Sequence, residues 1–146
     1  MAFAIHPRLA SGGFEIGTLG GCRLLLKNNA LFPWFILIPE VEGIEDLHEL
    51  PPGRYEEVMA AVRRVSGFVA AHFQPEKLNV ACIGNVVRQM HVQIIARSEG
   101  DPAWPGTVWG FEDKMSYTDE AVEKIRQAAR AFLKIDSPNR NPPFST

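Results

Sequence analysis

Residues 77–97 of this chain read KLNVACIGNVVRQMHVQIIAR, and this stretch gives the strongest indication of the fold. Apolar and β-branched side chains dominate both ends of the stretch, while Gly84-Asn85 between them is typical of a turn. The pattern predicts one strand over Lys77–Ile83 and another over Met90–Arg97.

The second of these strands carries the candidate chemistry. With a period of two, Gln89, His91 and Gln93 share one face, while the intervening apolar residues belong to the core. Alternate side chains on a strand lie about 7 Å apart. Amides can donate hydrogen bonds to phosphate oxygens, and an imidazole can attack phosphorus or move a proton. The row therefore predicts a site for a polyanion, with His91 as the nucleophile.

A half-exposed strand with a polar outer face is the simplest alternative, because it is the commonest cause of such alternation. Two neighbouring segments favour a site. Gly84-Asn85 could direct backbone N–H groups at an anion. The loop Ser98–Gly110 contains Trp, Pro and Gly and is too aromatic for ordinary exposure to solvent.

The rest of the chain predicts an α+β fold, with strands, one long central helix and then strands again. A helix is predicted from Pro51-Pro52-Gly53 to Gln74-Pro75, because its apolar residues recur at three- and four-residue steps. Thr118 is predicted to cap a C-terminal helix over 118–135, and Phe132 is expected on the apolar side of that helix. Further predictions are strands Cys22–Leu26 and Trp34–Ile38, glycine-rich turns with a tight hairpin over Ser11–Gly21, and an extended tail over 136–146.

Length and composition set the broad class of protein. The 146 residues fit one domain, 1–146, and the net charge of −2 provides no global field for nucleic acid or membranes. Cys22 and Cys82 lie in apolar runs, which favours buried free thiols over a disulfide. No cofactor or metal site is predicted, because the cysteines and histidines lack ligand spacing. The start has no secretory pattern and no apolar run approaches a membrane span, so a cytoplasmic protein is expected.

The stretch 78–97 resembles the signature of the histidine-triad (HIT) family, His-φ-His-φ-His-φ-φ, in which φ is apolar. His91 matches the middle histidine, whereas Gln89 and Gln93 replace the outer two. The segment 101–110, DPAWPGTVWG, and the N-terminal His6-Pro7-Arg8-Leu9 resemble a bacterial branch of the family. That branch commonly has Gln at the first position and keeps the third histidine. The resemblance covers residues 1–110, with a degenerate Gln-φ-His-φ-Gln triad.

The resemblance implies an antiparallel sheet with packed helices, a homodimer, and reaction at the α-phosphate of a nucleotide. The middle histidine would carry a transient nucleotidyl group. Galactose-1-phosphate uridylyltransferases, a related branch, keep a nucleophilic histidine followed two residues later by Gln, so Gln93 is compatible with a covalent step. Losing both flanking imidazoles removes the proton donors for a leaving group, which predicts weak or narrow hydrolysis. The apolar strands Cys22–Leu26 and Trp34–Ile38 also favour a dimer, because a small monomer would not cover them fully.

Other residues are candidates for binding nucleotide or phosphate. By resemblance, Asn85 falls at a phosphate-contacting position and Asn28 at a ribose-contacting one, although both also suit turns. The remaining candidates each have a structural alternative in turns, core packing or the sheet edge. They are Asn79 and Arg97 for phosphate, and Phe32 and Trp34 for stacking on a base.

Three functions remain open from the sequence. The first is a nucleotide hydrolase or nucleotidyl transferase acting through His91 on nucleoside phosphates or dinucleoside polyphosphates. The second is a module that binds a nucleotide or other phosphorylated small molecule without turnover. The third is a scaffold without ligand. Retention of His91 favours chemistry, the two Gln replacements favour binding alone, and the tryptophan-rich loop and Asn85 argue against the scaffold.

Overall fold

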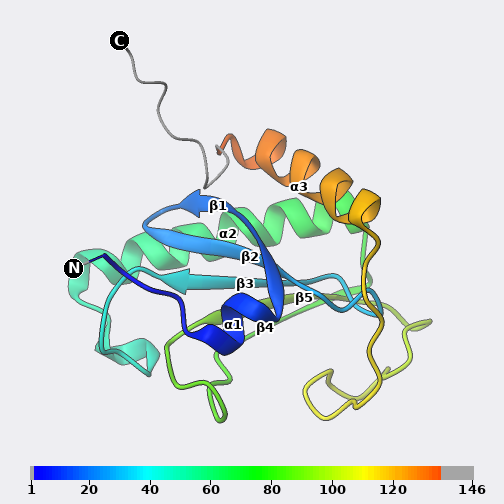
Figure 1. The fold of residues 1–146 in the computed structure, drawn as a ribbon, viewed down its shortest axis with the longest axis horizontal. Helices are drawn as coiled ribbons and strands as arrows, with labels where there is room; N and C mark the ends of the chain where they lie inside the picture. The colour runs from blue at the N-terminus through cyan, green and yellow to red at the C-terminus, as the bar shows by residue number, and fades with distance from the viewer. Residues whose placement is uncertain (1, 136–146) are drawn as a thin grey trace.

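The computed structural model describes residues 2–135, and their centre is a five-stranded antiparallel sheet in the order β1-β2-β3-β5-β4 (Figure 1). The strands are β1 (Gly13–Leu19), β2 (Cys22–Lys27), β3 (Trp34–Pro39), β4 (Lys77–Ala81) and β5 (Val92–Arg97). The helices are α1 (Pro7–Ser11), the short 3-10 helix η1 (Leu47–Glu49), α2 (Pro52–Phe73) and α3 (Asp119–Leu133). This arrangement confirms the predicted α+β fold with a long central and a C-terminal helix.

Both long helices begin and end where the sequence signals predicted. Pro52 occupies the first turn of α2, where the missing N–H costs nothing, and Gln74 ends the helix in a left-handed conformation before Pro75. The Thr118 hydroxyl accepts a hydrogen bond from the Ala121 N–H and caps α3.

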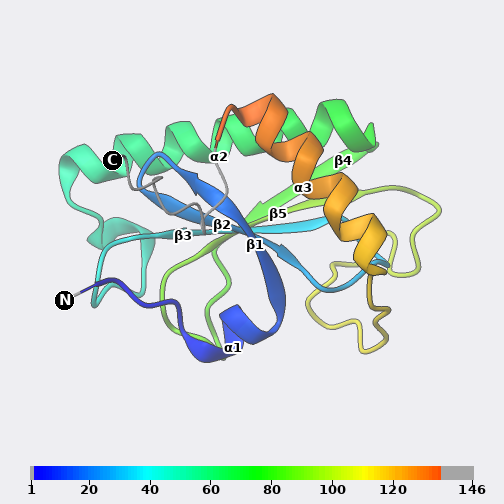
Figure 2. The same cartoon turned by 45° about the horizontal axis from the view of Figure 1, so that its top comes forward.

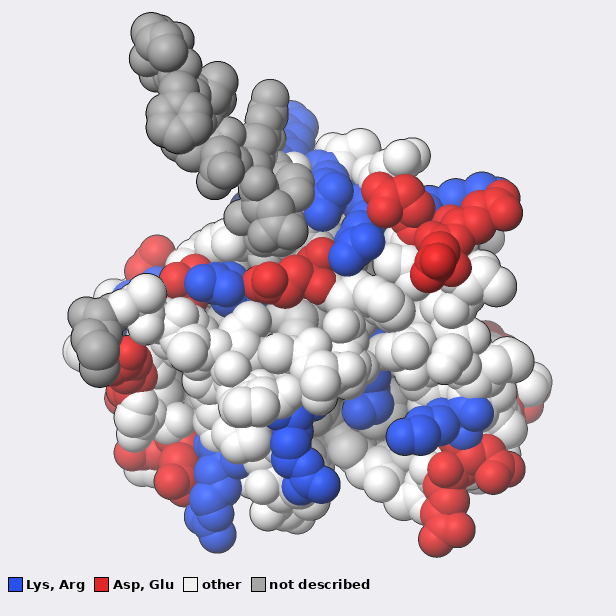
Figure 3. Space-filling model, in the orientation of Figure 1, with Lys and Arg blue, Asp and Glu red and all other residues white. Residues whose placement is uncertain are grey.

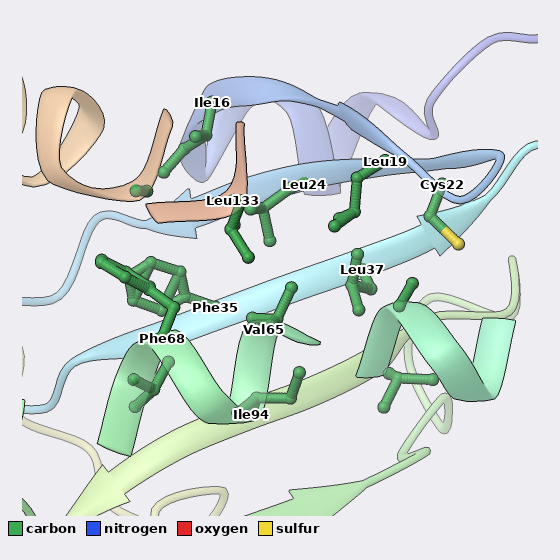
Figure 4. Close-up of a cluster of buried hydrophobic side chains, with 14 of the residues drawn as sticks. Ile16, Leu19, Cys22, Leu24, Phe35, Leu37, Val65, Phe68, Ile94 and Leu133 are labelled. Carbon is green, nitrogen blue, oxygen red and sulfur yellow. The ribbon is translucent and has the colours of Figure 1, made fainter. Parts of the chain in front are cut away.

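The two faces of the sheet are covered by different elements (Figure 2). α2 and α3 cover one face, where side chains of the sheet, such as Phe35 and Ile94, pack against Val65 and Phe68 of α2 (Figure 4). The opposite face carries a smaller apolar cluster of Trp34, Ile36, Ile95 and neighbours, covered by α1 and the loop after β5. The site described below opens on this second face.

Four local predictions were wrong. Residues 13–19, predicted as turns, form β1, because pairing with β2 and burial of Ile16 outweigh the glycine content. The predicted tight hairpin is confirmed, with its turn at Gly20-Gly21, where both φ angles are positive. β5 begins at Val92, so Gln89 and His91 precede the regular strand. β4 ends at Ala81, and Cys82 beyond it is exposed. Phe132, expected on the apolar side of α3, is 52% exposed.

The edges of the sheet differ in how they are protected. β2 and β3 lie inside the sheet and are buried, so the sequence argument that they would leave apolar surface for a dimer was wrong. On edge strand β1, the carbonyls of Glu15 and Ile16 accept hydrogen bonds from Arg126 and Arg130 of α3. On the other edge strand, β4, Val80 is 46% exposed.

The predicted extended tail, 136–146, lies outside the described residues. Across residues 2–135, no helix combines the length and apolarity needed to cross a bilayer.

Candidate functional site

His91 lies at the point where the chain enters β5. The Met90 N–H donates to the Ile44 carbonyl at 3.1 Å, which holds the preceding residue against the segment after β3. Regular pairing with β3 then begins at Val92, opposite Leu37. The imidazole is only 5% exposed, yet it lines two cavities and not an aliphatic core. The imidazole ring is therefore shielded from bulk solvent but accessible to a ligand from the cavities that it lines.

A chain of hydrogen bonds determines which nitrogen of His91 carries the proton. The Trp109 indole N–H can only donate, and it donates to the Gln93 side-chain oxygen. The Gln93 amide nitrogen then faces His91 Nε2 at 3.0 Å, and Nδ1 lies 2.7 Å from the Gln89 carbonyl oxygen. Because an amide NH₂ can only donate, Nε2 must be the acceptor. The network therefore assigns a neutral imidazole with its proton on Nδ1 and a lone pair on Nε2.

The surroundings favour this neutral form. Burial lowers the pKa of His91 from its ordinary value, the Gln89 carbonyl opposes that effect, and nearby Lys27 lowers the pKa further. The ordinary pKa of an imidazole is near 6.5, so a ring whose pKa is lower than that is largely neutral at pH 7. Neutral imidazole is the form that can act as a nucleophile.

The larger of the two cavities, about 580 Å³, opens on the face of the sheet that bears α1, and we call it the basic cavity. Arg8, Lys27 and Lys114 line it, together with Trp34, Trp109 and other residues, and no carboxylate from residues 2–135 does. Figure 3 shows basic side chains bordering the hollowed lower half of the face on which α1 lies. Three cations and aromatic walls suit a ligand that combines anionic groups with a flat ring.

The second cavity, about 410 Å³, also includes His91 in its lining. Glu45, Asp46, Cys82 and Arg88 line it, and Asn85 and His91 are shared with the basic cavity. Arg88 forms an exposed ion pair with Glu45 at 3.1 Å. His91 is therefore common to a basic cavity and one of mixed charge.

The structure brings four of the predicted site residues together in the basic cavity: His91, Gln93, Asn85 and Trp34. Gln93 is 5% exposed and its amide bridges Trp109 and His91. Trp34 is 6% exposed, and its buried indole N–H has no partner among the described residues.

Gln89 belongs to a different structural unit. Its side-chain oxygen accepts from the His6 N–H at 2.8 Å, and its amide nitrogen donates to the Ala4 carbonyl at 2.9 Å. The side chain thus fastens the N-terminal segment, and only its backbone carbonyl touches His91. The predicted contact of the Gln89 side chain with phosphate therefore has no support in this geometry, because that side chain binds the N-terminal segment.

Arg97 and Asn79 stabilise the loop after β5 and do not line the basic cavity. The guanidinium is 2% exposed, pairs with Asp101 at 2.7 Å and donates to the Asn79 side-chain oxygen at 2.9 Å. It also donates to the Gly106 carbonyl and lies over the ring of Phe32 at 5.6 Å. Four of the five N–H donors of the guanidinium have partners in the protein, and Arg97 does not line the basic cavity, so the predicted phosphate contact by Arg97 has no support in this geometry.

Phe32 and Asn28 are likewise used in packing. Phe32 is 1% exposed and meets Phe111 edge to face. The Asn28 side-chain oxygen accepts from the Tyr117 N–H at 2.9 Å. Neither residue lines the basic cavity.

Sequence reasoning did not single out Arg8, Lys27 and Lys114. They come from α1, the end of β2 and the segment before α3, and no local spacing connects them. The sequence feature that could have drawn attention to Lys27 is its position directly before the Asn28-Asn29 turn. For metals, residues 2–135 contain no cluster of three or more His, Cys, Asp or Glu side chains arranged to hold an ion.

Comparison with known proteins places this architecture in a family. The HIT domain family model matches residues 13–100. A histidine triad protein from Sinorhizobium meliloti 1021 is 37% identical, with a TM-score of 0.87, and the match covers 90% of this chain and 97% of that one. The chain belongs to the HIT family.

Other solved HIT structures agree over most of the chain. A histidine triad protein from Marinobacter aquaeolei VT8 is 36% identical with a TM-score of 0.87, covering 92% of this chain and 98% of that one. One from Bradyrhizobium japonicum is 32% identical with a TM-score of 0.88, covering 91% and 99% respectively. No curated protein matches the chain in sequence.

Membership of the HIT family supports a nucleotide-binding or hydrolase-type module. This HIT protein departs from a complete triad at Gln89 and Gln93. In its structure the two glutamines act on the remaining histidine from either side. The backbone of one holds Nδ1–H, and the amide of the other covers Nε2.

Proposed function

We propose that this HIT protein is a nucleotide hydrolase or nucleotidyl transferase that acts at an α-phosphate through a covalent nucleotidyl-His91 intermediate. The observation that supports this most directly is the 2.7 Å distance between Nδ1 and the Gln89 carbonyl oxygen, which assigns the proton to Nδ1. It leaves the Nε2 lone pair as the only nucleophilic position of a neutral ring, beside a cavity lined by cations.

The proposed reaction has two steps. The Nε2 lone pair attacks phosphorus, the bond from phosphorus to the leaving-group oxygen breaks, and that oxygen departs with the electron pair. The imidazole is then bonded to phosphorus at Nε2 while keeping its proton on Nδ1, and its positive charge is stabilised by the Gln89 carbonyl. Water or an acceptor hydroxyl next attacks phosphorus, loses its proton, and breaks the N–P bond.

Gln93 must change partner during the first step. Its amide nitrogen donates to Nε2 in the free protein, so a phosphate oxygen arriving at His91 has to take over that hydrogen bond. Trp109 keeps the amide oxygen turned away and the NH₂ group turned towards the reaction. Gln93 can stabilise the negative charge on phosphate but cannot protonate a leaving group. Catalysis is therefore expected to be weak, and restricted to leaving groups that depart as stable anions.

The experiment compares wild type with His91→Ala on a nucleotidyl ester that has a fluorescent leaving group. Loss of turnover in the variant, and a wild-type adduct whose mass increase equals one nucleotidyl group on His91, would support the proposal. Equal rates in the two proteins would end it.

A non-catalytic nucleotide-binding module is the second candidate, and the same hydrogen bond favours it. Gln93 covers Nε2, and no carboxylate lines the basic cavity to act as a proton donor or acceptor. In that case wild type and His91→Ala would bind nucleotide, and neither would give an adduct or turnover.

We also propose a homodimer formed through β4. The β1 edge is occupied by arginines of α3, whereas the β4 edge exposes Val80. An open edge strand is a ready template for pairing with another strand, and a second copy offers the same edge in two-fold symmetry. A sedimentation mass of one chain at micromolar concentration would contradict this.

A further inference from the structure

We propose that Lys27 and Lys114 form a second anion subsite in the basic cavity, so that the ligand carries at least one anionic group besides the phosphate at His91. The inference rests on the proposed function for the position of that first phosphate. It narrows the substrates of that function to nucleotides with a phosphoanhydride chain, in preference to nucleoside monophosphate esters with a neutral leaving group.

Hydrogen bonds between the turn after β2 and the segment before α3 bring Lys27 and Lys114 to the same cavity. Lys27 ends β2, and the turn that follows binds the segment before α3. The Ala30 N–H donates to the Met115 carbonyl at 2.6 Å, and the Asn28 side chain accepts from the Tyr117 N–H at 2.9 Å. The segment around Lys114 is thereby fastened to the end of β2, and both lysines line the basic cavity.

The charges in this cavity are not balanced by the protein. Among residues 2–135, neither lysine takes part in an ion pair, and Arg8 is a third cation in the cavity lining, which contains no carboxylate. Burial lowers the pKa of Lys27, and the neighbouring charge of Lys114 lowers it further. Two like charges held together in a partly desolvated place repel each other, and a bound anion removes that cost.

The walls of the cavity indicate what accompanies the anion. The Lys27 ammonium lies 4.8 Å from the centre of the Trp34 ring, and Trp109 meets Trp34 edge to face. The Trp34 indole N–H is buried in this wall without a partner. A volume of about 580 Å³ is in the range of small-ligand sites. A nucleoside di- or triphosphate combines an aromatic base with a chain of anions long enough to reach His91 and the lysines together.

The test measures binding as a function of phosphate chain length. AMP, ADP, ATP and inorganic triphosphate are titrated by calorimetry at low and high salt into protein carrying His91→Ala, which prevents turnover. Affinity is expected to rise from AMP to ATP and to fall with salt. Lys27→Met and Lys114→Met should each weaken ATP and triphosphate about tenfold or more, the usual effect of losing a charge-assisted contact, and AMP much less.

Two controls separate charge from folding. Lys124→Met removes an exposed lysine of α3 that pairs with Glu120, and it should leave all four affinities unchanged. Lys27→Arg keeps the charge and should retain most of the ATP affinity. Thermal melting of each variant shows that it is folded.

The outcomes distinguish this inference from the proposed function. Equal affinities for AMP and ATP, or losses in the lysine variants no greater than in Lys124→Met, would overturn the second subsite even if His91 forms an adduct. Chain-length dependence that requires both lysines would support it even if wild type forms no adduct at all.

Discussion

At the scale of single residues, the site depends on the orientation of one amide. Gln93 has a donor and an acceptor end, and Trp109 decides which end faces His91. That orientation in turn assigns the proton to Nδ1 of His91, next to the Gln89 carbonyl. A glutamine in place of a triad histidine is therefore not a simple deletion, because it keeps Nε2 of His91 unprotonated.

Trp109→Phe removes the indole donor and keeps an aromatic ring. Without that donor the Gln93 amide can turn its oxygen towards Nε2, which favours a proton there. We expect the pKa of His91 to rise and the Nδ1–H form to lose its dominance. Since the neutral ring is the nucleophile in the proposed reaction, the acid limb of any activity should move to higher pH. Nitrogen NMR of the imidazole across pH measures both effects.

Trp104→Phe is the matched control, because Trp104 lies over Arg97 and not over Gln93. The His91 titration should be the same as in wild type. An unchanged pKa and tautomer in Trp109→Phe would show that Trp109 does not orient the amide.

Gln93→His would restore an imidazole that can protonate a leaving group. A positioned general acid is typically worth about 10²–10⁴-fold in rate, so nucleotide hydrolysis should increase, most for poor leaving groups. The measurement is kcat on paired substrates with good and poor leaving groups. Unchanged or lower activity in a folded variant would show that Gln93 is adapted to its own role, as in the transferase branch.

At the scale of elements, the two edge strands of the sheet differ in how they are covered. Arg126 and Arg130 donate to carbonyls of β1, so α3 both covers the core and closes that edge. β4 has no such cover over Val80. The difference arises because α3 packs on β1 and α2, and Figure 1 shows it on the opposite side of the molecule from β4.

Val80→Asp tests whether β4 is a dimer edge. In a two-fold dimer the substitution places two like charges close together and removes apolar burial, so the dimer should dissociate. Sedimentation should then give the mass of one chain for the variant and of two for wild type. Thr18→Asp on β1 is the control and should remain a dimer, because α3 already covers that edge.

At the scale of the whole molecule, Arg97 joins the end of the sheet to the loop that carries Trp109. It connects β4 through Asn79, the loop through Asp101 and Gly106, and the smaller apolar cluster through Phe32. The Arg97 hydrogen bond holds the pKa of Asp101 below its ordinary value. The carboxylate therefore contributes stability above its unfolded pKa, which is lost as the pH falls through the lower folded value.

Asp101→Asn leaves Arg97 buried without its counter-charge. Breaking a buried pair in this way typically costs about 3–5 kcal/mol, and we expect a free energy of unfolding lower by about 3 kcal/mol at pH 7. Glu120→Gln, which breaks the exposed pair with Lys124, should change it by less than about 0.5 kcal/mol. Urea denaturation measures both. A cost for Asp101→Asn as small as that of the control would show that water reaches Arg97.

The sequence alone determined whatever depends on local pattern. The boundaries of α2 and α3, the buried strands β2 and β3, and the position of His91 beside Gln93 follow from periodicity, proline and a capping threonine, which act within a few residues. The family resemblance likewise rested on one continuous stretch. These features need no knowledge of distant contacts, because backbone hydrogen bonding and apolar periodicity are local.

Which polar side chains line the basic cavity depends on the tertiary structure and does not follow from the sequence pattern. Gln89 and Arg97 have the same two-residue periodicity as Gln93. The Gln89 side chain nevertheless binds the N-terminal segment, and the Arg97 side chain binds the loop at Asp101. Lys27 and Lys114 meet because a turn clamps a remote segment onto β2. A polar side chain takes whichever partner folding brings within hydrogen-bond distance, and that choice is settled by contacts between segments far apart in the chain, which no local spacing encodes.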